Sequence, residues 1–90
     1  MVDKKMILSS LALDLLRVAQ GYYRGSTQMA DRFYQEALKR KKETEVLALK
    51  LYLKVLLTQI EDIQLEKDLR QKAEMALMYS TLFQNAALSL

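Results

Sequence analysis

The sequence predicts an all-α protein, and three observations support that prediction. The 90 residues contain no proline and only two glycines, so few positions interrupt a helix. Apolar residues recur at steps of three and four, which is the spacing of one helix face. β-Branched residues are few and do not alternate with polar ones as they do in strands. We therefore expect one domain over residues 1–90, folded as a small antiparallel bundle of three or four helices.

Two helices are expected in the first half of the chain, over about residues 4–24 and 26–42. Their apolar stripes consist of Leu8, Leu11, Leu15, Val18 and Tyr22 in the first and Met29, Ala30, Phe33 and Ala37 in the second. Gly25 suits the left-handed conformation that ends a helix, and Ser26 suits the start of the next. We favour a break here, but the two stripes are in phase, so one long helix over residues 4–42 is the alternative.

The third helix is expected over about residues 45–64. The basic run Lys39–Lys42 suits the end of the preceding helix, and Thr44 is the candidate cap of the new one. The segment is apolar almost all round. Its one polar stripe consists of Lys50, Lys54, Thr58 and Glu61. Such a pattern predicts the central helix of the bundle.

The fourth helix is expected over about residues 68–88. Asp68 followed by Gln71 resembles a capping box. One face carries Leu69, Ala73, Ala76, Phe83 and Ala87, and Met75, Met78, Leu82 and Ala86 widen it towards the C-terminus. This face is wider than one neighbouring helix covers.

The composition argues against an enzyme. The chain has no histidine and no cysteine, so the usual general bases, nucleophiles and transition-metal ligands are missing. The carboxylates Glu61, Asp62 and Glu66 have lysine or arginine nearby, which favours solvated ion pairs over a metal site. Tyr34, Tyr52 and Tyr79 are expected in the core or at its rim, with hydrated hydroxyls, and not around a cofactor. We expect no catalytic residue, no cofactor and no metal.

The favoured function is binding of another protein. Hydrophobic residues make up 51% of the chain, which is more than a small helical monomer easily buries. Met75, Met78, Leu82 and Ala86 form the candidate face for a partner helix or a second copy of the chain. We therefore expect an interaction module that forms a homo-oligomer or binds a partner helix.

The competing function is that of a small nucleic-acid-associated protein. Arg32, Lys39, Arg40, Lys41 and Lys42 are the candidate phosphate contacts, and the net charge is +3. The basic run is flanked by glutamates and points around the helix, so a helix end that complements the dipole is the favoured interpretation.

The expected location is the cytoplasm, without membrane association. The absence of cysteine suits a reducing compartment. Lys4, Lys5 and the apolar residues 6–13 resemble the start of a secretory signal, but Asp14 and Arg17 interrupt it. Lys50 and Lys54 interrupt the most apolar segment, Val46–Ile60, so no membrane span is expected.

Two families of helical interaction modules are similar to parts of the chain. Ala30-x3-Tyr34-x2-Ala37 resembles the second helix of a tetratricopeptide repeat, and Ala48-x3-Tyr52-x2-Val55 repeats the spacing. Residues 26–88 also resemble the three-helix microtubule-interacting and trafficking domain, through Ala30 and Ala37, residues 48–52 and residues 69–74. Both resemblances imply a module that binds helices or peptides in a groove between helices and catalyses no reaction.

Overall fold

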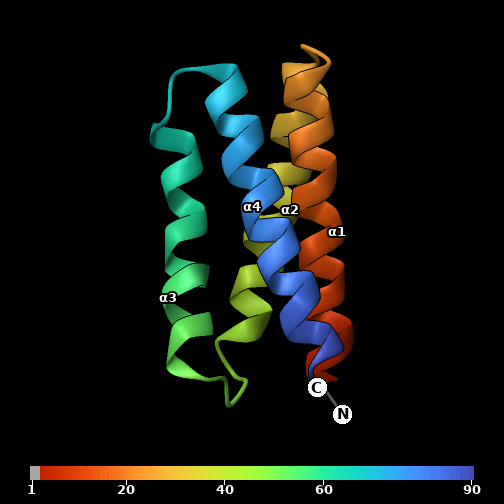
Figure 1. Ribbon diagram of the computed structural model, residues 1–90, viewed down its shortest axis with the longest axis vertical. Helices are drawn as coiled ribbons and strands as arrows, with labels where there is room; N and C mark the ends of the chain where they lie inside the picture. The colour runs from red at the N-terminus through yellow and green to blue at the C-terminus, as the bar shows by residue number, and fades with distance from the viewer. Residues whose placement is uncertain (1–2) are drawn as a thin grey trace.

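The computed structural model describes residues 3–90, which form four α-helices and one 3-10 helix. The elements are α1 (Lys4–Tyr23), α2 (Thr27–Thr44), α3 (Leu51–Gln59), the 3-10 helix η1 (Ile60–Leu65) and α4 (Leu69–Leu88). Successive α-helices run in opposite directions, so α1 begins and α4 ends at the same end of the bundle (Figure 1). The predicted all-α antiparallel bundle is confirmed.

Helix α1 is the central helix of the bundle because it packs against both α2 and α4. It begins at Asp3, whose carboxylate Oδ1 accepts hydrogen bonds from the backbone N–H of Lys5 at 2.9 Å and of Met6 at 3.4 Å. Its buried face contains the apolar stripe predicted from the sequence, with Leu8, Leu11, Leu15, Val18 and Tyr22 all in the core. The long amphipathic stripe of α1 therefore supplies much of the core.

The chain breaks at Gly25, which decides between the two alternatives for residues 4–42. Gly25 has a φ of 75°, the left-handed conformation that glycine adopts without strain. Its N–H donates to the carbonyl of Tyr22 at 3.1 Å, and the N–H of Ser26 donates to the carbonyl of Gly21 at 2.8 Å. These two bonds form a Schellman motif, which ends α1. The predicted break is confirmed. Ser26 occupies the position before α2, but its side chain makes no capping hydrogen bond.

A close approach between α1 and α2 follows this turn. A Cβ atom built at Gly21 would lie 2.8 Å from the Cβ of Ala30 and 2.9 Å from its Cα and backbone nitrogen. Real Cβ atoms do not approach backbone atoms so closely, so only glycine fits between the two helices. The pair of small residues thus sets how near α2 lies to α1.

The third helix was predicted over residues 45–64, and the prediction is wrong at both ends. Thr44 does not cap a new helix; it is buried at the end of α2, where its hydroxyl donates to the carbonyl of Lys41. Residues 45–50 form a turn and an extended segment, and α3 begins only at Leu51. The last part of the predicted helix tightens into η1. Residues 45–50 have adequate helix propensity, but the chain must reverse direction here, so tertiary structure overrides the local preference.

The apolar sequence of α3 predicted the central helix of the bundle, but α3 lies at the edge. It buries Leu53 and Leu57, and η1 adds Ile60 and Ile63 to the core. The hydroxyl of Tyr34 on α2 donates to the carbonyl of Ile60 at 2.8 Å. This buried hydrogen bond joins α2 to η1, and burial raises the pKa of Tyr34 to about 12. The Tyr34 hydroxyl is therefore bonded within the core and not hydrated as expected.

Helix α4 begins at Asp68, as predicted. The Asp68 carboxylate accepts from the N–H of Arg70 at 2.8 Å and of Gln71 at 3.4 Å. The predicted capping box with Gln71 does not form, because the N–H of Asp68 donates instead to the carboxylate of Glu66, two residues before it, at 3.1 Å. Further along α4, the hydroxyl of Ser80 donates to the carbonyl of Ala12 at 2.6 Å, which joins α4 to α1.

We expect Gly21→Ala to destabilise the fold. The new methyl group would push α2 away from α1, which costs about 1–3 kcal/mol and exceeds the gain of about 1 kcal/mol in helix propensity. Urea unfolding followed by circular dichroism measures the change. Gln20→Ala, at the neighbouring exposed position of α1, is the control and should change stability by less than about 0.5 kcal/mol. Equal stability of the two variants would contradict the close approach.

Candidate functional site

The candidate site starts from the short helix α3, which has more apolar surface than it buries. Leu53 and Leu57 face the core, while Leu51, Tyr52 and Val55 are exposed. Leu51 leaves 76% of its surface exposed. Because residues 51, 52 and 55 lie within one turn of each other, they form a single apolar stripe beside the core face.

Helix α4 extends this apolar stripe across the neighbouring surface. Leu82 is 38% exposed and Met78, one turn before it, is also exposed. Met75 is half-buried and packs against the core. Ala86 is only 6% exposed, so it belongs to the core and is removed from the partner face predicted from the sequence. Of the four predicted residues, Met78 and Leu82 are therefore the ones that a partner reaches most easily.

An open apolar groove of about 550 Å³ lies between α3 and α4. It is lined by Leu51, Tyr52, Val55, Leu56, Gln59 and Leu82. We call these six residues together with Met78 the α3–α4 face. Six of the seven side chains are apolar or aromatic, and the seventh is an uncharged amide. Such a surface binds by excluding water from apolar groups, and a carboxamide adds one hydrogen-bonding position.

Sequence reasoning found the α4 half of this face but not the α3 half. The relevant signal was present, since residues 45–64 are apolar almost all round. That pattern fits a buried central helix and an exposed binding helix equally well. Only the position of α3 at the edge of the bundle separates the two interpretations.

Ion pairs occupy much of the basic run on α2. Lys39 pairs with Glu36 at 3.5 Å, and Arg40 lies between Asp14 at 3.7 Å and Glu43 at 3.6 Å. A fourth pair joins Lys41 on α2 to Glu61 on η1 at 3.3 Å. Arg32 is exposed on the same helix, about two turns before Lys39. These carboxylates reduce the positive field that a phosphate backbone would meet, and binding to nucleic acid stays a prediction.

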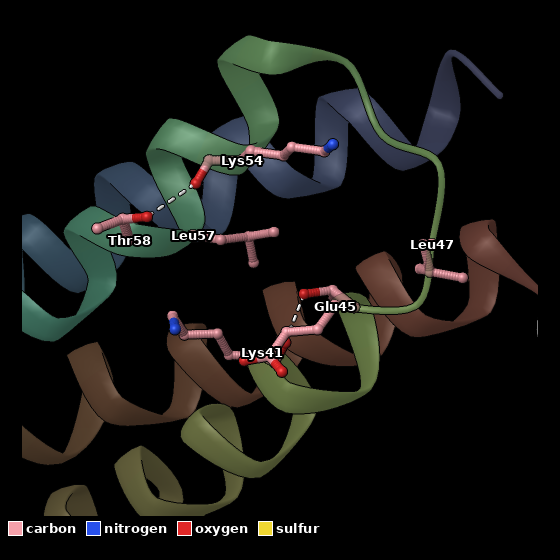
Figure 2. Close-up of a pocket in the computed structure, with 7 residues that line it drawn as sticks. Lys41, Glu45, Leu47, Lys54, Leu57 and Thr58 are labelled. Atoms are coloured by element: carbon pink, nitrogen blue, oxygen red, sulfur yellow. Dashed lines mark hydrogen bonds between the residues drawn. The ribbon is translucent and has the colours of Figure 1, made fainter.

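A second cavity, of about 320 Å³, lies between the end of α2 and the side of α3 that faces away from the groove (Figure 2). Its lining consists of Lys41, Thr44, Glu45, Leu47, Lys54, Leu57 and Thr58. Two lysines and a glutamate surround it, but the hydroxyl of Thr58 already donates to the carbonyl of Lys54 at 3.1 Å. The cavity is therefore a mixed polar surface without a single preference for cations or anions.

Among the side chains of residues 3–90, no three histidine, cysteine, aspartate or glutamate residues gather as metal ligands would. Within the same residues, no helix combines the length and the apolar character needed to cross a bilayer.

The chain matches no protein family, no curated protein and no solved structure.

Asp14 is the one carboxylate of α1 that the fold buries. It is 8% exposed, and its Oδ2 atom has no hydrogen-bond partner within the residues described. Burial raises the pKa of Asp14 above its ordinary value of 3.8, although the nearby Arg40 guanidinium opposes this effect. A carboxyl with a raised pKa contributes stability that is full below the unfolded value and is lost as pH rises through the folded value.

We expect Asp14→Asn to be as stable as the original chain or more stable at neutral pH, by up to about 1 kcal/mol. Its advantage should shrink as pH falls towards 3.8, where Asp14 becomes protonated and the burial cost disappears. Arg40 keeps Glu43 as a partner, so the substitution leaves no isolated charge. Denaturant unfolding at intervals between about pH 3 and pH 7 measures the difference.

Asp62→Asn, which removes an exposed carboxylate from η1, controls for the change in net charge. A constant difference between Asp14→Asn and the original chain at every pH would show that burial of Asp14 carries no such cost.

Proposed function

We propose that this chain is a non-enzymatic protein-interaction module that binds an apolar helical surface through the α3–α4 face. The observation that carries the proposal is the exposure of Leu51, Tyr52, Val55 and Leu82 together around one groove, with Met78 exposed one helical turn before Leu82. Single exposed apolar residues are ordinary on protein surfaces, but a contiguous apolar patch is typical of an interaction site.

The mechanism is helix-in-groove docking. A partner helix with apolar residues at steps of three and four would lie along the groove, and burial of apolar area contributes about 25 cal/mol per Å². The flexible side chain of Met78 can adapt to the partner, while Tyr52 combines a large apolar ring with a polar hydroxyl. The resemblance to two families of helical-hairpin modules implies the same mode of binding.

The proposal includes a cytoplasmic location, which the cysteine-free composition favours. It involves no catalytic step, since the α3–α4 face has no histidine, carboxylate, lysine or arginine to exchange a proton with a bound molecule.

A fluorescent dye that binds apolar surface tests the accessibility of the face. At low micromolar chain concentration we expect 8-anilinonaphthalene-1-sulfonate to gain fluorescence, because the groove is open and apolar. Leu82→Lys should lower this gain, since it places a charge at the groove.

Leu77→Lys is the matched control. Leu77 lies on the same helix and is 39% exposed, against 38% for Leu82, but it points away from the groove. Equal loss of dye binding in both variants, or no dye binding by the original chain at a concentration where it is monomeric, would contradict the proposal.

A further inference from the structure

We propose that the α3–α4 face is covered by a second copy of this chain, which packs against it about a two-fold axis. This inference rests on the proposed function and names the partner of that same face. The area of the face, its lack of charge and the arrangement of its two helices support a dimer.

The area of the face fits a modest dimer. From the exposed fractions, its apolar side chains leave roughly 500 Å² uncovered, near the upper end of the range of about 300–600 Å² for the largest patch on a monomer. Two such faces in contact bury at most roughly 1,000 Å², which is the lower threshold for a specific interface between proteins. The area therefore suits a weak, reversible dimer.

The charge distribution suits self-association. A two-fold axis brings the same surface patch of both copies together, so any charge in the patch meets a like charge. The side chains of the α3–α4 face are uncharged. Lys54 of α3 lines the second cavity on the other side of the helix, together with Lys41 (Figure 2). Self-pairing through this face therefore avoids repulsion.

The helices of the face form half of a common arrangement. Helices α3 and α4 run antiparallel (Figure 1). The groove is lined by residues of both helices. A second antiparallel pair laid over the first produces a four-helix bundle of two layers. In this bundle every helix has antiparallel neighbours. Helix α3 has nine residues, fewer than an isolated helix needs, so packing on its exposed side would also stabilise it.

The other apolar groove is less suited to this role. It lies between α1 and α4, where Leu13, Leu16 and Leu77 share the lining with polar residues. The polar residues are Ser80, Thr81, Gln84 and Asn85. Ser80 and Thr81 already donate to the carbonyls of Ala12 and Leu77, but burial of Gln84 and Asn85 against a copy would require new hydrogen bonds for both. The α3–α4 face also has two such groups, the Gln59 carboxamide and the Tyr52 hydroxyl, but it exposes five large apolar side chains, whereas the α1–α4 groove exposes two, Leu13 and Leu77.

Sedimentation equilibrium of the full chain over micromolar to millimolar concentrations tests the inference. We expect a reversible monomer–dimer equilibrium with a dissociation constant in roughly the micromolar range. Leu82→Lys and Val55→Lys should each weaken dimerisation by about 100-fold or more, because each charge enters the interface twice. Leu77→Lys should change the dissociation constant by less than about threefold, which corresponds to a surface effect.

The outcomes separate failure of the dimer from failure of the proposed function. Circular dichroism identifies variants that keep their helices, and the two groove substitutions come from different helices, so either one suffices. A chain that stays monomeric at every concentration overturns the dimer. If that monomer still binds the dye and Leu82→Lys removes the binding, the proposed function stands alone. If it binds no dye, both proposals fail. A dimer broken only by Leu77→Lys places the contact at the α1–α4 groove and overturns the inference.

Discussion

The packing of α1 between α2 and α4 is the constraint on which the rest of the structure depends. Gly21 and Ala30 bring α2 so close to α1 that no added Cβ atom fits between them. On the opposite neighbour, the hydroxyl of Ser80 reaches the backbone carbonyl of Ala12 at 2.6 Å. Small residues at both contacts let the helices approach, and the large side chains between them then fill the core.

The position of α3 follows from this arrangement. With α2 and α4 packed against α1, the remaining helix lies at the edge and buries only one of its apolar sides. The hydrogen bond from Tyr34 to Ile60 and the ion pair from Lys41 to Glu61 attach η1 to α2. Because α3 buries Leu53 and Leu57 against the core, the stripe of Leu51, Tyr52 and Val55 on its other side stays exposed. The candidate site is thus the part of the apolar sequence that a core built around α1 leaves uncovered.

The charged residues have a different role from the apolar ones. Arg40 and Lys41 connect α2 to α1 and to η1 through carboxylates, so half of the basic run serves contacts between elements. Asp14 is part of this network but is buried at a cost, which its raised pKa reflects. Charge is therefore concentrated away from the groove, and the groove keeps its apolar character.

The all-α class, the cap at Asp68 and the core stripe of α1 were determined by the sequence alone. Each depends on a local rule, such as the reach of an aspartate to nearby N–H groups or the spacing of a helix face. The sequence favoured a break at Gly25 but left one long helix as the alternative, and the left-handed φ of Gly25 decided between them. The start of α3 at Leu51, the burial of Ala86 and the exposure of Leu51 were decided only by tertiary structure. Periodicity shows that a residue is apolar and which face it occupies, but it does not show whether another helix covers that face. Which helix becomes central depends on how closely the backbones approach, and that distance is set by pairs of residues such as Gly21 and Ala30 acting across two helices.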